Sequence, residues 1–344
     1  MNKEILFEVK DVKVWFPIRK GFPKKTVGYV KAVDGVSLNV YKGETLGIVG
    51  ESGCGKTTLG KAMMLLTTPT SGQVLYRYGD EYKDIVKFDR DEVLQFRKKV
   101  QMIFQDPYSA MNPMKKIYTA LEEPLKIHKV KSKSERERIM SESLGLVNIP
   151  NEYLFKYPHE FSGGQRQRVC IARALQINPE VLVCDEAVSA LDVSIQAQVL
   201  NLMKKIQKER SLTYVFIAHD LSVVQYMSDR IAVMYLGKVV ELASSRALYN
   251  QTLHPYSQSL LSAVPLPVLD QKKKRIILKG DVPSPINKPS GCAFHQRCVY
   301  CMDICKKVDP PLLKQGDEEH YVACHLYTQE AKDEVQTEPL QKDA

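Results

Sequence analysis

The sequence has no long apolar run. Nowhere do about 18 apolar residues follow one another, so no transmembrane helix is expected. The first residues, Met1-Asn2-Lys3-Glu4, lack the apolar stretch of a secretory signal, so we expect the protein to stay in the cytoplasm. An internal repeat is absent too. The apolar content of 44% is ordinary for a soluble globular protein, and 344 residues suggest two or three domains.

The sequence has few clusters of one charge sign, although the net charge is +9. That charge suits a nucleic acid, an anionic membrane surface or a polyanionic ligand. Most basic residues are scattered, and the compact run Lys272-Lys273-Lys274-Arg275 lies in an expected linker. We interpret this run as a solvated segment rather than a nucleic-acid patch.

The eight cysteines are unevenly placed. Three of them are isolated and fit small core or loop positions: Cys54, Cys170 and Cys184. Five crowd the last sixth of the chain with the spacing C-x5-C-x2-C-x3-C-x18-C: Cys292, Cys298, Cys301, Cys305 and Cys324. Because a cytoplasmic protein rarely keeps disulfides, this cluster indicates metal. Thiolates suit a [4Fe–4S] cluster or tetrahedral zinc, and a reduced, metal-free region is the third reading.

A phosphate-binding loop is the clearest motif that is present. Residues 50–57 read G-x-x-x-x-G-K-T, between an expected strand at 45–49 and an expected helix at 58–66. Backbone N–H groups of such a loop approach a triphosphate closely, and the helix N-terminus favours its charge. The Lys56 ammonium is expected to reach the β- and γ-phosphates, and the Thr57 hydroxyl to bind Mg²⁺. The nucleotide-binding residues expected here are Gly50, Glu51, Ser52, Gly53, Cys54, Gly55, Lys56, Thr57 and Thr58.

A second glycine-rich segment, Ser162-Gly163-Gly164-Gln165, opens another expected helix and forms a second anion site. One subunit has no need of two phosphate cradles so far apart in sequence. The pair therefore predicts a head-to-tail dimer, in which this segment of one chain caps the nucleotide bound to the other.

Polar residues follow three expected buried strands. Asp185 ends the apolar run 181–184 and is placed to hold Mg²⁺, and Glu186 comes next and can orient or deprotonate the attacking water. Gln105 and His219 end the strands at 100–104 and 214–218. Ligands bind at the carboxyl edge of a parallel sheet, so we expect all four side chains near the phosphate, with His219 donating to the γ-phosphate.

Strands alternating with helices predict a mostly parallel α/β sheet. Further strands are expected at 6–13 and 36–40, and a helix at 195–208. Residues 17–31 are rich in Pro, Gly and Lys and are expected to form a loop. Helical spacing at 117–148 predicts an all-helical insertion, the stretch at Pro265–Pro267 marks a boundary, and the polar tail 328–344 is expected to be disordered.

In this order the motifs resemble the ATPase subunits of ATP-binding-cassette (ABC) transporters, over residues 5–245. The resemblance assigns Walker A to 50–57, the Q-loop to Gln105, the signature to 162–165, Walker B to 181–185, the catalytic base to Glu186, the D-loop to 189–192 and the switch histidine to His219. It implies that Gln165 and Asp192 contact the nucleotide and that Thr57, Gln105 and Asp185 are Mg²⁺ ligands. It also implies an adenine-stacking aromatic: Phe16 fits best, with Trp15 and Tyr29 as rivals. Phe161 stands where leucine is usual in the family, and Ala187 where proline is common.

The same resemblance implies a division of the chain. A P-loop, RecA-like ABC core would occupy 1–108 and 165–250 and include an antiparallel β subdomain. A helical subdomain carrying the signature would occupy 109–164, and a small cysteine-rich domain 251–327.

A narrower resemblance concerns the cargo. The stretches 31–37, 50–55, 104–107 and 283–298 are similar to ATPases of oligopeptide and dipeptide importers. It implies an ATP-driven motor on the cytoplasmic face of the membrane, two transmembrane permease subunits and an external peptide-binding protein. The long insertion at 17–30 resembles the second of the two ATPases that such importers pair, which implies a heterodimer.

For the cysteines, the resemblance implies a [4Fe–4S] cluster on Cys292, Cys298, Cys305 and Cys324, with Cys301 where the family commonly has a small residue. Zinc remains the alternative, because Cys298-x-x-Cys301 is also a zinc knuckle and His325 adjoins Cys324. Importers of nickel, glutathione or sugars stay open as alternative functions, as does a soluble ABC protein of DNA repair or translation. The repair or translation class would show a second cassette or a zinc finger beside the signature, and the sequence has neither. An inactive partner is disfavoured by the presence of Glu186 and His219.

Overall fold

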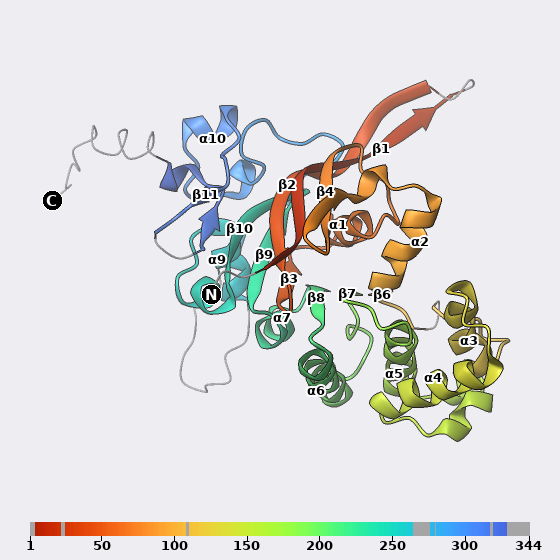
Figure 1. Cartoon of the computed structure of the whole chain (residues 1–344). Coiled ribbons are helices and arrows are strands. Elements are labelled where there is room, and N and C mark those ends of the chain that lie inside the picture. Colours follow the sequence, from red (N-terminus) through yellow and green to blue (C-terminus); the bar gives the residue numbers. More distant parts are fainter. Residues whose placement is uncertain are drawn as a thin grey trace, which may run out of the picture.

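The computed structural model contains two sheets that stack with helices around them (Figure 1). It describes residues 4–21, 25–107, 110–263, 276–278, 280–316 and 319–328. The basic run at 272–275, the boundary at 265–267 and nearly all of the expected disordered tail lie outside these residues. Among the described residues, no helix combines the length and the apolar character needed to cross a bilayer.

The first sheet is antiparallel, with the order β2-β1-β4-β5. Its strands are β1 (Ile5–Lys20), β2 (Lys25–Tyr41), β4 (Ser71–Tyr78) and β5 (Glu81–Asp84). Pairing of β1 with β4 reaches only to Lys13, and beyond it β1 and β2 form a ribbon that projects from the molecule (Figure 1).

The loop expected at 17–31 was therefore wrong for the described residues: Pro17 still pairs with Tyr29, and Lys20 with Lys25. A proline is compatible with this ribbon, because the far edge of β1 has passed its last pairing with β4 there and needs no ladder N–H. Composition alone suggested a loop, whereas the ladder decides the conformation.

The second sheet has eight strands in the order β11-β12-β10-β9-β3-β8-β7-β6. The five strands from β9 to β6 run parallel to one another, and β10, β12 and β11 continue the sheet in antiparallel pairs. The bounds are β3 (Thr45–Val49), β6 (Val100–Ile103), β7 (Val181–Asp185), β8 (Thr213–Ile217), β9 (Arg230–Tyr235), β10 (Lys238–Ser244), β11 (Leu313–Lys314) and β12 (Tyr321–Val322). The expected parallel α/β sheet is confirmed.

Each face of this sheet packs on a different core. On β7, Leu182 and Cys184 join a core cluster with the helices drawn below the central sheet in Figure 1. Val181 and Val183 join the other cluster, on the side of the first sheet. Burial on both faces explains why β7 is a continuous apolar run rather than an alternating one. The helices are α1 (Lys56–Met63), α2 (Arg90–Lys99), α3 (Ile117–Ile127), α4 (Lys133–Leu146), α5 (Gly163–Leu175), α6 (Val193–Arg210), α7 (Leu221–Met227), α8 (Ser245–Asn250), α9 (Pro255–Ser262) and α10 (Asp303–Lys307).

The C-terminal segment (280–316 and 319–328) extends the central sheet. Val322 of β12 pairs with Glu241 of β10. The Glu241 carboxylate is fully buried and accepts hydrogen bonds from His320 Nε2 at 2.8 Å and from the backbone N–H of Leu253 and His254. A buried carboxylate needs such partners to offset its lost hydration. This segment is therefore joined to the core by a strand and by a buried polar network.

Candidate active site

The phosphate loop lies between β3 and α1 at the carboxyl edge of the central sheet. The Lys56 side chain folds back over the loop, because its Nζ donates to the carbonyl oxygens of Gly50 at 2.8 Å and Glu51 at 3.1 Å. Lys56 is only 5% exposed. The ammonium also donates to Cys54 Sγ at 3.9 Å. A buried ammonium bonded to neutral groups keeps a strong attraction for an anion.

Two glycines of the loop lie where backbone contacts leave no room for a side chain. Gly50 has φ +152°, and a Cβ there would lie 2.1 Å from the Met234 carbonyl oxygen. Gly55 has φ +103°, and its Cβ would lie 2.0 Å from the Ala32 carbonyl oxygen. Any side chain at either position would push the loop away from its neighbouring strands, so the glycine pattern has a structural cause besides phosphate approach.

Thr57 and Asp185, which are 128 residues apart in sequence, meet at this edge. The Thr57 hydroxyl on α1 donates to Asp185 Oδ1 at 2.7 Å. Burial raises the pKa of Asp185, and the neighbouring Glu186 charge adds to the rise, while the Thr57 hydrogen bond and two lysines oppose it. An ionised carboxylate that is poorly hydrated favours a hard dication, and a hydroxyl beside a carboxylate is a suitable oxygen donor set for Mg²⁺.

Glu186 meets both of the other polar residues predicted at strand ends. Gln105 donates from Nε2 to Glu186 Oε2 at 2.8 Å, and His219 Nδ1 lies 3.3 Å from the same oxygen. Glu186 itself has φ +48°, and its N–H donates to the Ile217 carbonyl oxygen at 2.8 Å. A non-glycine residue held in this conformation next to a phosphate loop is typical of a functional site. Of the three predicted Mg²⁺ ligands, Thr57 and Asp185 are hydrogen-bonded to each other. The third, Gln105, is hydrogen-bonded to Glu186 instead.

The segment 162–165 lies elsewhere in the chain. Ser162 caps α5: its Oγ accepts from the Gln165 N–H at 3.3 Å, and Gln165 Oε1 accepts from the Ser162 N–H at 3.0 Å. Asp192 caps α6 in the same way, accepting from the Ile195 N–H at 3.0 Å. Figure 1 shows α5 among the lower helices, apart from α1 and the phosphate loop. The structure of one chain does not bring the two glycine-rich segments together.

The three candidate adenine-stacking aromatics differ in their surroundings. Trp15 donates from Nε1 to Asp34 at 3.1 Å and carries the Lys31 ammonium 4.7 Å from its ring. Phe16 is 44% exposed, and Tyr29 equally so. An exposed ring offers a face to a base, so the structure leaves Phe16 and Tyr29 better placed than Trp15.

The C-terminal cysteines gather without forming a metal site. The Cys292 N–H donates to the Cys305 carbonyl oxygen at 2.8 Å. Burial raises the pKa of Cys324 to about 12, with further contributions from Cys292, Cys298 and Cys305. Within the part of the chain that is described, no group of three or more His, Cys, Asp or Glu side chains is arranged to hold a metal ion. The geometry of the described residues therefore does not support the expected four-cysteine ligand set.

The zinc alternative is not favoured either. His325 donates from Nε2 to the Val308 carbonyl oxygen at 2.9 Å, so this nitrogen already has a structural partner. The Cys301 thiol donates to the Met302 carbonyl oxygen at 3.6 Å.

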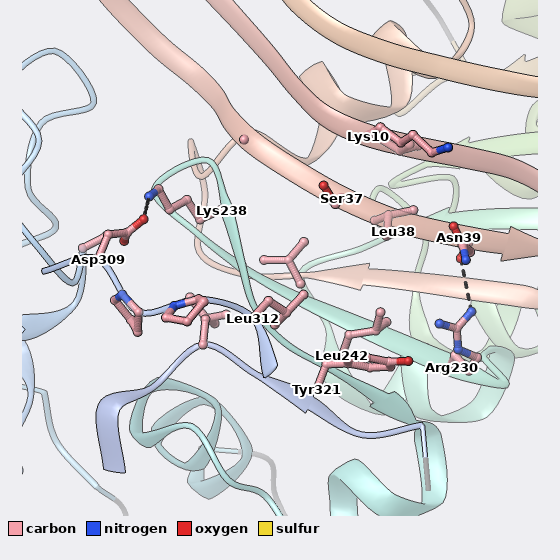
Figure 2. A pocket seen from close by; sticks show the side chains of 18 of the residues that line it. Lys10, Ser37, Leu38, Asn39, Arg230, Lys238, Leu242, Asp309, Leu312 and Tyr321 are labelled. Atoms are coloured by element: carbon pink, nitrogen blue, oxygen red, sulfur yellow. Dashed lines mark hydrogen bonds and ion pairs between the residues drawn. The ribbon is translucent and has the colours of Figure 1, made fainter. Parts of the chain in front are cut away.

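A cavity of about 550 Å³ lies between the first sheet, β10 and the C-terminal segment (Figure 2). Polar side chains at its rim are already paired: Lys238 with Asp309, and Arg230 with the Asn39 carbonyl oxygen. Apart from Cys292, its lining contains none of the predicted site residues. The chemistry of the chain therefore lies at the phosphate loop and not in this cavity.

The sequence missed two contacts to the phosphate loop. Arg297 and Tyr256, to which no role was assigned, both contact Glu51. They lie 246 and 205 residues away in sequence, and no local pattern signals either contact.

Comparisons with known proteins identify the family of the chain. Residues 33–189 match the family model described as "ABC transporter", and residues 240–305 match "Oligopeptide/dipeptide transporter, C-terminal region". The oligopeptide transport ATP-binding protein AppF of Bacillus subtilis is 51% identical over 95% of this chain and 99% of its own length. The dipeptide transport ATP-binding protein DppF of Escherichia coli is 45% identical over 94% of this chain and 95% of its own.

Solved structures agree as well. A dimeric structure of the ATP-binding cassette MJ0796, in a post-hydrolysis state with ADP and phosphate, matches with a TM-score of 0.60 and 29% identity, over 70% of this chain and 99% of that one. An ATPase of this fold requires a phosphate-binding loop, a Mg²⁺ site and a group that orients the attacking water. The chain belongs to the ATP-binding subunits of oligopeptide and dipeptide ABC transporters, and it is an ATPase.

Proposed function

We propose that this chain is the ATP-hydrolysing motor subunit of an importer that carries oligopeptides or dipeptides across the cytoplasmic membrane. The observation that carries the proposal is the position of Glu186, whose carboxylate is held by Gln105 and lies beside His219 at the end of β7. The relatives that match nearly the whole chain are named as oligopeptide and dipeptide transport proteins, which supports this class of cargo over nickel, glutathione or sugars.

The residues divide the work of hydrolysis. Lys56 and the backbone N–H groups of the loop bind the β- and γ-phosphates, and Thr57 and Asp185 would hold Mg²⁺, which would neutralise charge on the phosphates. Glu186 accepts the proton of the attacking water, and Gln105 fixes the orientation of the accepting oxygen. His219, whose side chain is largely exposed, donates to the γ-phosphate.

The active unit is a head-to-tail dimer. Ser162, Gly163, Gly164 and Gln165 of one chain cap the ATP bound at the phosphate loop of the other, and Asp192 approaches it from the start of α6. The separation of α5 from the phosphate loop within one chain supports this arrangement. We propose a related ATPase as the second chain, and Phe16 as the aromatic residue that stacks on adenine.

The permease subunits dock beside Gln105. A cavity of about 320 Å³ lies there between the end of β6, α3 and α5, and it is lined by the exposed side chains of Phe104 and Ile127 together with Pro124 and Ala174. An apolar recess of this size suits a short helix from a membrane subunit. Such docking would hold the chain on the cytoplasmic face of the membrane, in an assembly with two permeases and an external peptide-binding protein.

For the C-terminal cysteines we propose a structural metal centre whose ligands are Cys292, Cys298, Cys305 and Cys324, a [4Fe–4S] cluster rather than zinc. The proposal rests on the closeness of Cys292, Cys298 and Cys305 to Cys324, whose pKa their charges raise, and on the soft-metal preference of thiolates. Binding would require release of the thiol protons and closure of the ligands around the metal. No step of hydrolysis depends on it.

The test is uptake in the native host. A strain in which Lys56→Ala replaces the chromosomal copy should take up labelled di-, tri- and pentapeptides at a small fraction of the wild-type rate. Arg246→Gln, an exposed change on α8, should leave uptake unchanged. Affinity purification of the tagged wild-type chain should bring down two multi-span membrane proteins and a related ATPase. Normal peptide uptake by the Lys56→Ala strain, with loss of another cargo, would overturn the peptide assignment.

A further inference from the structure

One residue of the phosphate loop is held from outside the cassette. Arg297, in the C-terminal segment, donates from Nη1 to both carboxylate oxygens of Glu51, at 2.9 and 3.2 Å. The Tyr256 hydroxyl on α9 accepts the backbone N–H of the same Glu51 at 2.8 Å. Side chain and backbone of this loop residue are therefore both fixed by groups beyond residue 189, where the matched cassette ends.

The two anchors are themselves rigid. The Arg297 side chain is 9% exposed and that of Glu51 27%, so the ion pair is largely shielded from water. Tyr256 is fully buried, and its ring packs on Tyr235 with centroids 4.7 Å apart. The Phe294 ring, three residues before Arg297, packs on both of these tyrosines at 5.5 and 5.3 Å. This aromatic cluster joins the C-terminal segment to α9 and to β9.

The charge of Glu51 makes the anchor matter for ATP. A carboxylate within the phosphate loop repels a triphosphate, and in a partly buried site this repulsion is poorly screened. Arg297 neutralises the carboxylate and holds it at the C-terminal segment. The Tyr256 hydroxyl sets the direction of the Glu51 peptide at the entry to the loop.

We infer that Arg297 is a positioning residue of the ATP site: it neutralises and restrains Glu51, so that the C-terminal segment controls the affinity of the phosphate loop for ATP. This inference rests on the ATPase function of the loop and deepens it. Because such coupling is reciprocal, bound ATP in turn stabilises the C-terminal segment in its place against the core.

The experiment measures binding of fluorescent ATP and ADP analogues to the full chain at about 0.05 M and 0.5 M salt. Arg297→Gln should weaken ATP binding about tenfold at low salt, because it leaves a partly buried carboxylate unpaired beside the phosphates. The loss should be smaller for ADP, which carries less charge, and smaller for both nucleotides at high salt. Adding Glu51→Gln to Arg297→Gln should restore ATP binding to within about threefold of wild type.

Two controls separate this role from support of the fold. Lys288 also joins the C-terminal segment to the core, through Asp34 at 3.1 Å and the Leu236 carbonyl oxygen at 2.6 Å. Lys288→Gln should lower the melting temperature without a salt-dependent loss of ATP affinity, and the exposed change Arg246→Gln should alter neither. The inference is overturned if Arg297→Gln binds ATP as wild type does, if Glu51→Gln fails to rescue it, or if Lys288→Gln shows the same salt-dependent loss. Failure of the wild-type chain to bind ATP above the level of Lys56→Ala would instead overturn the proposed function.

Discussion

Gly164 faces Ile195 so closely that a Cβ at Gly164 would lie 2.3 Å from Ile195 Cγ2. The second glycine of the signature is thus required by the packing of α5 on α6, besides any contact it makes with ATP. The neighbouring Gly163 is different, since its added Cβ would meet Leu191 Cδ2 at an ordinary 3.4 Å.

We therefore expect Gly164→Ala to destabilise the isolated chain by about 1–3 kcal/mol, the usual cost of overpacking. Gly163→Ala is the matched control and should change the free energy of unfolding little. Urea denaturation of both variants measures the difference, and Ile195→Ala added to Gly164→Ala should recover part of the loss. Equal stability of the two alanine variants would show that α5 and α6 adjust freely.

Glu186→Gln tests the catalytic base. The amide keeps the size of the side chain and can still bond to Gln105, but it cannot accept a proton from water. We expect kcat for ATP hydrolysis to fall about a thousandfold, while ATP binding persists and an ATP-bound dimer accumulates. Size-exclusion chromatography with and without ATP detects the dimer. Turnover within about threefold of wild type would exclude Glu186 as the base.

The geometry of the candidate site was predictable where its signals are local. Gly50, Gly55 and Lys56 stand at fixed spacing because one turn must expose N–H groups to phosphate, and Asp185 was found because a buried strand ends at it. The parallel order of the strands then predicts that such ends meet at one edge, as Thr57 and Asp185 do.

The parts that failed depend on distant partners. Strand β12 has two residues and no periodicity, so nothing in the sequence shows that it pairs with β10. The Pro-, Gly- and Lys-rich composition of residues 17–31 predicts a loop, whereas their described parts pair in the ribbon of β1 and β2. The contact between Arg297 and Glu51 spans 246 residues and is set by tertiary packing alone.

Asp185→Asn separates Mg²⁺ binding from nucleotide binding. Asparagine can still accept from Thr57, but it lacks the charge that holds Mg²⁺, so Mg²⁺-dependent hydrolysis should fall at least about a hundredfold while ATP binding in EDTA stays within about threefold. Steady-state turnover measures the hydrolysis, and isothermal titration with and without Mg²⁺ measures the ATP binding.

The raised pKa of Asp185 adds a prediction on stability. A carboxyl whose folded pKa exceeds its unfolded value destabilises the protein when ionised, above that folded pKa. Without Mg²⁺ at pH 7, Asp185→Asn should therefore melt no lower than wild type. A clear drop in its melting temperature would contradict the conclusion that the ionised Asp185 carboxylate destabilises the fold.

The metal centre is tested by composition. Full chain purified without oxygen should contain about four iron and four sulfide per chain if a [4Fe–4S] cluster is present. Serine variants of Cys292, Cys298, Cys305 and Cys324 should each lose the iron, and Cys301→Ser is the control that should keep it. Loss of iron in Cys301→Ser would show a different ligand set, and one zinc per chain in place of iron would favour the knuckle.

His254 gives the fold a predictable dependence on pH. It caps α9 by accepting the Tyr256 N–H at Nδ1, and it is 1% exposed. Burial lowers its pKa to about 4 from 6.5, although the Glu241 charge opposes the shift. Between pH 6.5 and about 4, His254 is protonated in the unfolded chain but neutral in the folded chain. The free energy of unfolding therefore decreases as the pH falls through this range.

The loss from this residue should approach about 3 kcal/mol at the acid end. His254→Asn keeps an oxygen that can cap α9 but cannot titrate, so its free energy of unfolding should fall less between pH 6.5 and 4 than that of wild type. The exposed His159→Asn is the control and should retain the wild-type slope. Urea denaturation at a series of pH values measures all three slopes, and an unchanged slope in His254→Asn would mean that another group governs acid unfolding.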